Sequence, residues 1–345
     1  MRVALIHPQL ILKGGLETRL FNYLQFFRGR GDEVTIITAK VDESLKLPKE
    51  VSVIKIDLSI IPKPVRMLFF NRRLKPFIDG EKFDFVLSLG RTSHQHALLC
   101  PGNHIGYLKA MKKRLLTPID YMNIRLDKKG FENSKVVLAA SVMIKDELMR
   151  YYNVSENKIK VAYPPVNVEV FNMSLKKEKE RLRKKYGLSK DKTTFLFVST
   201  SHDRKNFGLL QDIFNVMKAQ PIELAVAGFE IRAGSPNIRY LGFIRPMQEV
   251  YAAADFLIHP AFYEPFGQVV SESICCGTPV IISEKTGARE VVSADEGIIV
   301  KDYKVESWMN AIQYAMKTPF SISSEFAFKK KLTLKQHMEV ILERK

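Results

Sequence analysis

Short apolar segments alternate with amphipathic segments along most of the chain, and this alternation limits the fold more than any other feature. In the first half, apolar runs at Val3–Ile6 and Val34–Thr38 flank residues 16–27, whose apolar positions recur at helical spacing. The second half repeats the pattern, with apolar runs at Thr194–Ser199 and Phe256–Ile258. Strands that alternate with helices form parallel sheets with helices packed on their faces. We therefore expect an α/β protein with two doubly wound, Rossmann-like domains facing across a cleft.

A proline pair marks the expected boundary between the two domains. Tyr163-Pro164-Pro165 follows the last apolar run of the first half, and proline disfavours continued regular structure. We assign residues 1–163 to an N-terminal domain and residues 164–322 to a C-terminal domain. Residues 323–345 are expected to form a C-terminal helix that packs back on the N-terminal domain.

The composition is that of an ordinary globular protein, with 46% hydrophobic and 26% charged residues. No uninterrupted apolar run approaches the roughly 18 residues that span a bilayer. The start, MRVALIHPQL, becomes polar too early for a secretory signal and is more typical of a first strand. Three cysteines, two of them adjacent, give neither a disulfide framework nor a zinc spacing. The expected compartment is the cytoplasm.

The positive charge is concentrated in the first half of the chain. The net charge is +17, and residues 1–165 carry +12 of it, with 28 Lys and Arg against 16 Asp and Glu. Such an excess indicates an acidic partner, which could be nucleic acid, anionic lipid or a phosphorylated substrate. Residues 60–78 and 105–116 mix cations with aromatic and aliphatic side chains. These stretches are either amphipathic helices packed on the sheet or surfaces that contact an anionic membrane.

Two glutamates lie in a segment that combines a turn, a helix and a strand. Glu264 precedes Gly267, where a helix is expected to begin, and Glu272 lies within that helix. If the helix begins there, its first N–H groups and Glu264 face the same space, which suits an anion or a polyhydroxyl ligand. The alternative is an ordinary loop with two solvated glutamates.

Two further loops have the composition of phosphate sites. Gly14-Gly15 lies at the first strand-to-helix turn, where glycines allow close approach of a ligand, although paired glycines are also plain turn residues. Arg204 and Lys205 lie between a strand and the start of a helix. Cations are unfavourable at a helix start unless an anion lies near them, so a diphosphate is expected there.

Together these motifs resemble the retaining glycosyltransferases of family 4, which have the GT-B fold. The spacing Glu-x7-Glu of Glu264 and Glu272, the Arg204-Lys205 loop and the Gly14-Gly15 loop occur in the family's order and cover nearly the whole chain. Residues 91–108, 131–133 and 139–152 resemble more specifically the lipopolysaccharide-core α-glucosyltransferases. The chain departs from the family pattern at Asn103, where relatives have aspartate, and at the Tyr-Pro-Pro-Val-Asn hinge, which lacks the usual Asn-Gly.

The resemblance implies roles for individual positions. Glu264 would contact the donor sugar, Glu272 the ribose, and Arg204 with Lys205 the diphosphate. His104 would lie near the reacting sugar, so the expected catalytic positions are His104, Glu264, Arg204 and Lys205. Phe243 and Ile244 would lie near the base. The remaining donor-binding positions are loop and helix-start residues, namely Gly14, Gly15, Phe266, Gly267 and Gln268. No metal site and no cofactor besides the nucleotide-sugar donor are expected.

The resulting hypothesis is a retaining, metal-independent hexosyltransferase. It would move a hexose from a nucleotide diphosphate sugar, such as UDP-glucose, to a lipid-linked or lipopolysaccharide-core glycan at the inner face of the cell membrane. One alternative is a GT-B sugar-nucleotide epimerase or hydrolase. Another is a basic nucleic-acid-binding protein, but the sequence has no recognisable nucleic-acid module and no nucleic-acid partner is expected.

Overall fold

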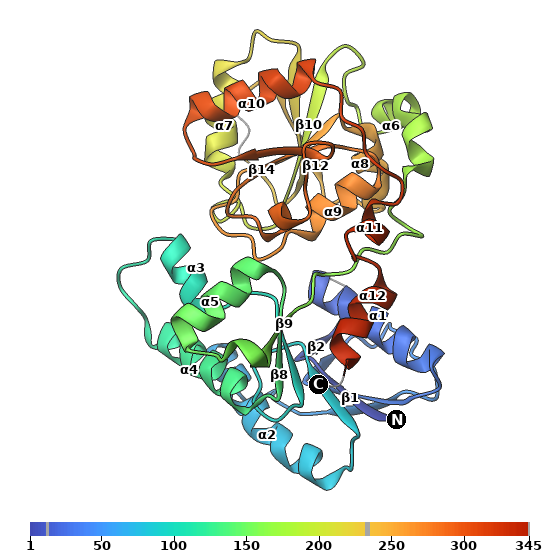
Figure 1. The fold of residues 1–345 in the computed structure, drawn as a ribbon, viewed down its shortest axis with the longest axis vertical. Coiled ribbons are helices and arrows are strands. Elements are labelled where there is room, and N and C mark those ends of the chain that lie inside the picture. Colours follow the sequence, from blue (N-terminus) through green and yellow to red (C-terminus); the bar gives the residue numbers. More distant parts are fainter. Residues whose placement is uncertain (12–13, 232–234, 344–345) are drawn as a thin grey trace. The chain divides into compact units, whose positions relative to one another are not determined.

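The computed structural model describes residues 1–11, 14–231 and 235–343, which form two compact units (Figure 1). The first unit contains residues 1–163 and the segment that starts at Leu334, and the second contains Pro164–Thr333. The chain therefore passes into the second unit at the proline pair. It returns to the first unit at Leu334 and not at residue 323.

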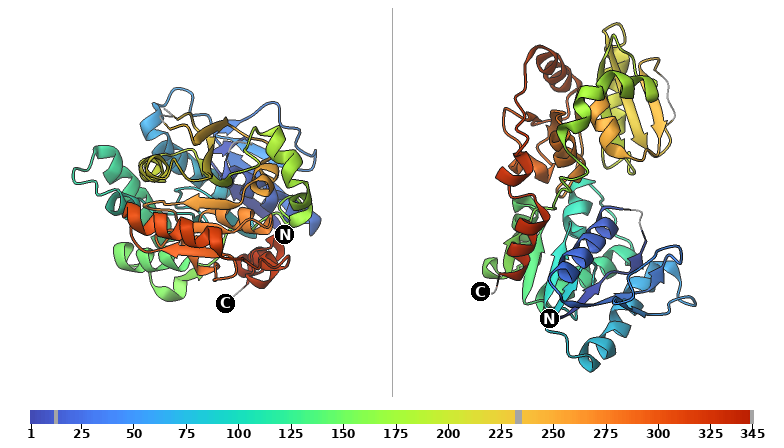
Figure 2. Two further views of the ribbon diagram at one scale, coloured as in Figure 1. Left: turned by 90° about the horizontal axis from the view of Figure 1, so that it is seen from above. Right: turned by 90° about the vertical axis from the view of Figure 1, so that its right-hand side faces the viewer.

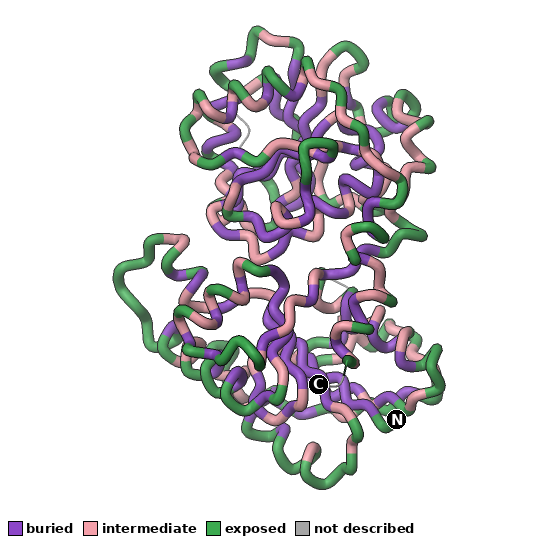
Figure 3. The backbone as a smooth tube through the Cα atoms, in the orientation of Figure 1, coloured by how far each residue is buried: buried purple, intermediate pink, exposed green. Residues whose placement is uncertain are grey.

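The first unit is built on one parallel sheet of seven strands, in the order β5-β3-β1-β6-β7-β8-β9. Its central strands are short, apolar and buried (Figure 3), as expected for parallel strands covered on both faces. The strands are β1 (Arg2–Ile6), β3 (Glu33–Thr38), β5 (Ser52–Lys55), β6 (Phe85–Ser88), β7 (Ala97–Cys100), β8 (Val136–Ala139) and β9 (Ile159–Val161). A two-stranded sheet pairs β2 (Gln9–Leu10) with β4 (Lys40–Val41).

Helices lie between these strands in sequence. They are α1 (Gly15–Gly29), α2 (Arg66–Gly80), α3 (His104–Ala110), α4 (Pro118–Asn133) and α5 (Val142–Tyr152), with short 3-10 turns at Lys63–Val65 and Glu156–Lys158. Helix α4 begins at a proline in its first turn, and the side chains of Thr117 and Asp120 cap it reciprocally.

The expected helix over residues 105–116 is shorter than the sequence suggested. Helix α3 ends at Ala110, and Lys112 adopts a left-handed backbone with φ of 52°. In the loop that follows, Nζ of Lys113 lies 2.5 Å from Oδ2 of Asp120. The basic-apolar pattern of this segment therefore belongs to a short helix followed by a loop.

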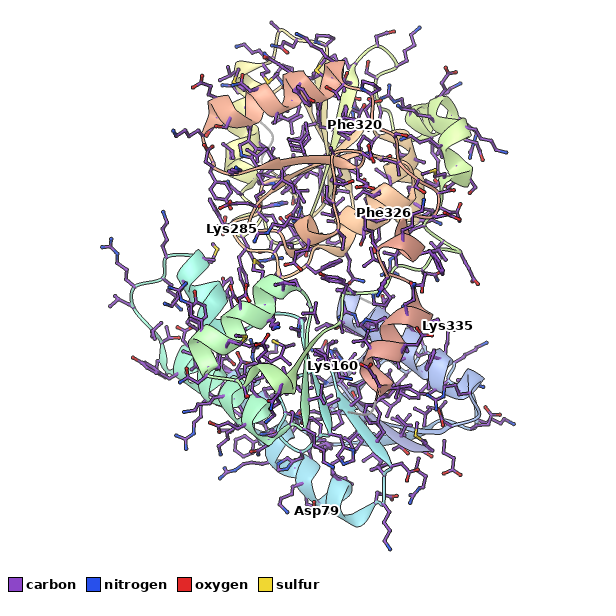
Figure 4. The ribbon with its side chains drawn as sticks, viewed as in Figure 1. Asp79, Lys160, Lys285, Phe320, Phe326 and Lys335 are labelled. Atoms are coloured by element: carbon purple, nitrogen blue, oxygen red, sulfur yellow. The ribbon has the colours of Figure 1, made fainter. Side chains whose placement is uncertain are left out.

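The last helix, α12 (Leu334–Leu342), packs in the first unit beside α1 and β9 (Figures 1 and 2). Its His337 lies 2.6 Å from the hydroxyl of Tyr23 on α1 and 2.8 Å from the carbonyl oxygen of Tyr163. Lys160 of β9, labelled in Figure 4, donates to the carbonyl oxygens of Val340 and Glu343. These contacts hold the end of the chain to the residue at which the chain first leaves the unit.

The second unit has a parallel sheet of six strands, in the order β12-β11-β10-β13-β14-β15. The prediction of two Rossmann-like units is thus confirmed. The strands are β10 (Thr193–Ser199), β11 (Ile222–Gly228), β12 (Ile238–Gly242), β13 (Phe256–His259), β14 (Val280–Ser283) and β15 (Gly297–Val300). The helices are α6 (Lys179–Lys185), α7 (Phe207–Val216), α8 (Met247–Ala253), α9 (Gln268–Cys275), α10 (Val305–Lys317) and α11 (Phe326–Lys329), with 3-10 turns at Met173–Glu178 and Gly287–Glu290.

Each unit has its own apolar core. Trp308 of α10 and Phe195 of β10 are fully buried in the second unit, and Tyr23 and Phe27 of α1 are fully buried in the first. Burial of each such side chain contributes on the order of 2–3 kcal/mol relative to exposure. The cores therefore fix the strands, and the loops at the strand ends are left to carry chemistry.

Gly228 closes the pairing of β10 with β11 at the edge where the loops emerge. Its φ is 123°, and a Cβ there would lie 2.0 Å from the carbonyl oxygen of Ser199, its partner across the two strands. Only glycine fits this position, because both the backbone conformation and the space exclude a side chain.

We expect Gly228→Ala to lower the free energy of unfolding by more than about 2 kcal/mol. Gly208 of α7 is the matched control, because a Cβ there meets no atom within 4 Å. Gly208→Ala should stabilise the unit by roughly 0.5–1 kcal/mol through helix propensity. Chemical denaturation measures both, and equal stability of the two variants would show that position 228 tolerates a side chain after all.

Candidate functional site

The loops that follow five strands of the second sheet emerge at the same edge. Because all six strands are parallel, the carboxyl ends of β10, β11, β12, β13 and β14 share one side of the sheet. Open α/β sheets bind ligands at this edge. The predicted site residues of this unit fall in three of these loops or directly after them: those that follow β10, β12 and β13.

The carboxylate of Glu264 is the centre of an ion cluster in these loops. Its Oε2 atom lies 3.1 Å from Nη1 of Arg204, 3.8 Å from Nζ of Lys205 and 3.3 Å from Nε2 of His259. Arg204 also donates to the carbonyl oxygen of Tyr263 at 2.6 Å, and Lys205 to that of Val198 at 3.0 Å. The structure thus joins three of the four expected catalytic positions.

The cluster keeps a positive charge. Burial alone would raise the pKa of Glu264, but the hydrogen bond from His259 and the charges of Lys205 and Arg204 lower it below its ordinary value. Burial lowers the pKa of His259, so its ring is neutral near pH 7 and its Nε2–H donates to Glu264. One carboxylate therefore faces two cations, and the side chain of Arg204 is still 22% exposed. This arrangement can attract a further anion.

The segment from Glu264 to Gln268 is fixed by backbone hydrogen bonds to the loop after β14. Glu264 and Phe266 accept from the N–H groups of Gly287 and Ala288 at 2.8 and 2.7 Å. Gly267 precedes α9 with φ of 95°, and a Cβ there would lie 3.1 Å from Glu264 and Thr286. Helix α9 then starts at Gln268 with no acidic side chain in its first turn and no side-chain cap.

Glu272 lies on α9 in an environment unlike that of Glu264. Its Oε2 atom accepts a hydrogen bond from the hydroxyl of Tyr251 on α8 at 2.9 Å. Burial raises the pKa of Glu272 to about 7, and the Tyr251 hydroxyl and the Lys205 charge offset this only in part. Lys205 therefore acts electrostatically on both glutamates, and burial lowers its own pKa. The two carboxylates have different charges at neutral pH, one fully ionised and one near its titration midpoint.

Two aromatic rings lie in the neighbouring loops. Phe243 follows β12 and is 69% exposed, and it packs edge-on against Phe229, which follows β11, with ring centroids 5.6 Å apart. Ile244, the other position expected near the base, is half-buried next to Phe243. Exposed phenylalanine rings are available for stacking on a planar ligand.

His104, the fourth expected catalytic position, belongs to the first unit. It begins α3, its backbone N–H donates to Asp127 at 2.9 Å, and its Nε2 atom lies 2.9 Å from Oδ1 of Asp120. Asn103 caps the same helix by accepting from the N–H of Gly106 at 2.7 Å. The carboxylate beside the histidine thus comes from Asp120 on α4, although the sequence has asparagine at position 103.

Gly14 and Gly15 also belong to the first unit. Gly14 is the N-cap residue of α1 and Gly15 its first residue, and both are exposed. The carbonyl oxygen of Gly14 accepts from the hydroxyl of Thr18 at 2.9 Å. The neighbouring residues 12 and 13 lie outside the described chain.

Several residues of the site were not identified from the sequence. His259 and Tyr251 orient the two glutamates, Phe229 completes the aromatic pair, and Asp120 faces His104. Their partners are 5 to 21 residues away in sequence. Of these four residues, only Phe229 could have been identified from the sequence, because it directly follows a strand that ends in glycine. Within residues 1–11, 14–231 and 235–343, no group of three or more His, Cys, Asp or Glu residues could hold a metal ion.

Two family models match the chain. Residues 13–170 match the glycosyltransferase family 4 model, and residues 178–331 match the model of glycosyl transferases group 1. The first match falls almost entirely in the first unit and the second within the second unit.

Relatives of known name agree with these models. A probable transglycosylase of Burkholderia thailandensis is 30% identical over 300 residues, which are 87% of this chain and 82% of the relative. The O-antigen chain mannosyltransferase B of Escherichia coli is 27% identical over 195 residues, about half of each chain at 52% and 50%.

Solved structures share the fold over nearly the whole chain. WaaG, a glycosyltransferase involved in lipopolysaccharide biosynthesis, matches with a TM-score of 0.79 and 15% identity over 99% of this chain and 95% of its own. HepE of Anabaena, in complex with UDP-glucose, matches with a TM-score of 0.75 and 13% identity over 99% and 98%. The chain therefore belongs to the glycosyltransferases of family 4, with the two Rossmann-like units of the GT-B fold.

Proposed function

We propose that this glycosyltransferase moves a hexose from a nucleotide diphosphate sugar, such as UDP-glucose, to a lipid-linked or lipopolysaccharide-core glycan. In this proposal the configuration at the sugar is retained and no metal ion takes part. The observation that supports it most is the ion cluster around Glu264, in which two cations face one carboxylate. That cluster lies at the sheet edge where such folds bind nucleotides.

The proposed reaction generates negative charge on the diphosphate, which the cations of the cluster can stabilise. The bond between the sugar's anomeric carbon and the diphosphate oxygen breaks, and its electron pair stays on the diphosphate. The acceptor's hydroxyl oxygen bonds to the same carbon, and its proton passes to the departing phosphate. Arg204, Lys205 and the start of α9 would stabilise the growing negative charge. Glu264 would bind sugar hydroxyls and orient the two cations.

The remaining residues are proposed to bind the rest of the donor. Glu272 would accept hydrogen bonds from the ribose, and Phe243 with Ile244 would contact the base. His104 and the Gly14-Gly15 loop keep the roles that the family resemblance implies, beside the reacting sugar and against the donor. Asp120 would hold the His104 ring by accepting its Nε2–H, which leaves Nδ1 as the atom free to meet a hydroxyl.

Arg204→Gln should reduce both UDP-glucose binding and transfer, because it removes one of the two cations that face the diphosphate. We expect a loss of roughly 10²–10³ in turnover, as when one fixed electrostatic donor is removed from an active site. Release of UDP with a glycolipid acceptor measures turnover, and calorimetry measures binding.

The matched control is Arg239→Gln, since Arg239 is an exposed arginine on β12 of the same unit. It should leave both quantities unchanged. Full activity of Arg204→Gln, or an equal loss in the two variants, would contradict the assignment of the donor site.

Donor binding should depend on pH through Glu272. Its pKa in the folded protein is about 7, above the ordinary value of 4.5, so the folded state holds this proton up to near neutral pH. If ribose hydroxyls bind the ionised form, affinity for UDP-glucose rises by up to roughly tenfold between pH 6 and pH 8. Glu272→Gln should abolish that rise, and a rise that persists in the variant would assign it to another group.

The same raised pKa affects stability. The protonated Glu272 carboxyl adds to the free energy of unfolding. This contribution is complete below the pKa of the group in the unfolded state and is lost as the pH rises through about 7. Wild-type stability relative to Glu272→Gln should therefore decrease between pH 5 and pH 8.

We also propose that the first unit contacts an anionic membrane. Among the described residues, no helix is long and apolar enough to span a bilayer. Leu115, in the loop after α3, is 85% exposed beside Lys112 and Arg114, and Ile60 before α2 is 84% exposed. An apolar residue flanked by cations suits the interface of an anionic bilayer.

Charge reversal tests this contact. Arg72 is an exposed residue of α2. Arg72→Glu with Arg114→Glu should release the protein from sedimenting vesicles that contain phosphatidylglycerol. The control pair Lys190→Glu with Lys218→Glu makes the same change of net charge in the second unit and should not release it. Equal binding of the two double variants would refute the contact.

A further inference from the structure

A basic cavity lies in the first unit, and its wall contains none of the residues assigned to the donor. A cavity of about 730 Å³ opens where β1, β3 and β5 end, and residues Pro8, Lys40 and Asp57 follow these strands in its wall. Its volume is in the range of small-molecule sites. It also lies at the carboxyl edge of a parallel sheet, where ligands of such folds bind.

Four cations and one carboxylate line this cavity. Lys40, Lys55 and Lys63 are exposed, and in the described part of the chain none of them forms an ion pair within 4 Å. Arg66 is held by backbone carbonyl oxygens, at 2.7 Å to Ile61 and 3.4 Å to Ser59. Its guanidinium is therefore positioned without a counter-ion.

The single carboxylate does not balance these charges. Asp57 accepts the backbone N–H of Ser59 at 2.8 Å, and this bond is the main cause that lowers its pKa, with smaller contributions from Arg73 and Lys55. Asp57 thus stays ionised and offsets about one of the four cations. Arg66 also begins α2, and a cation at a helix start is unfavourable without an anion nearby.

The rest of the wall is apolar. Leu58 and Phe70 are buried behind the cavity, and Met67 of the first turn of α2 lies half-buried in its wall. A free inorganic anion would use the cations and leave this apolar surface against water. A ligand with an apolar group next to its negative charge would use both.

We propose that this cavity binds a phosphate or diphosphate ester of an apolar alcohol. Given the proposed function, on which this assignment of a role rests, the ester is the part of the acceptor that joins its glycan to a lipid chain. The cations hold the phosphate oxygens, and Met67 and Leu58 contact the first carbons of the chain. Residues 63–70 then serve acceptor recognition in addition to any contact with a bilayer.

Geranyl diphosphate is a water-soluble probe for this site. Calorimetry should show that the wild-type protein binds it, that it binds inorganic diphosphate at least about tenfold more weakly, and that it does not bind geraniol. The triple variant Lys40→Gln, Lys55→Gln, Lys63→Gln should lower the affinity for geranyl diphosphate roughly tenfold or more, since three charge-assisted contacts are lost.

A matched triple variant separates the site from general charge. Lys46→Gln, Lys49→Gln, Lys82→Gln removes the same charge from exposed lysines outside the cavity wall and should bind geranyl diphosphate like the wild type. UDP-glucose affinity should be unchanged in both triple variants. A wild-type protein that fails to bind UDP-glucose would overturn the proposed function, and not the cavity site itself.

Three results would overturn the site. The first is equal affinity of the two triple variants for geranyl diphosphate. The second is equal wild-type affinity for inorganic and geranyl diphosphate, which would indicate a plain anion site. The third is binding to phosphatidylglycerol vesicles with no affinity for geranyl diphosphate, which would assign these lysines to the bilayer surface.

Discussion

One carboxylate, that of Glu264, organises the second unit's functional edge. It lies within 4 Å of Arg204 and Lys205, from the loop after β10, and of His259, the last residue of the neighbouring strand β13. A buried carboxylate remains ionised only where partners repay its desolvation. The ionised carboxylate in turn holds two cations close together, because its attraction to each of them offsets the repulsion between them. A cluster with one negative and two positive groups is already arranged to receive a further anion.

The second glutamate shows how environment separates two identical side chains on one short segment. Glu272 is bonded to a tyrosine hydroxyl and contacts no cation directly, and its burial raises its pKa to about 7. Glu264 contacts two cations and is lowered in pKa, which disfavours a role for it as a proton donor beside Glu272. We therefore propose that both are binding groups, one for the sugar end of a donor and one for the ribose.

Much of this organisation could be predicted from the sequence, for physical reasons. Strands β1, β3 and β10 begin one residue before the predicted apolar runs and end where those runs end, because buried parallel strands are continuous apolar segments. The three residues Arg204, Lys205 and Glu264 could be grouped because parallel strands bring their carboxyl ends together. Contacts such as Tyr251 with Glu272 could not be foreseen, since they depend on how helices pack. The helix expected over residues 105–116 is too long, because Lys112 has a left-handed backbone that a helix cannot contain. The pattern of charged residues does not predict that conformation.

A crystal structure of the protein with UDP-glucose bound would test the donor site most directly. We predict the diphosphate beside the guanidinium of Arg204 and the start of α9, with the ribose hydroxyls on Glu272. Glu264 should then have exchanged part of its contact with Arg204 for hydroxyls of the sugar. A nucleotide bound elsewhere, or a diphosphate that contacts neither Arg204 nor Lys205, would contradict the central claim.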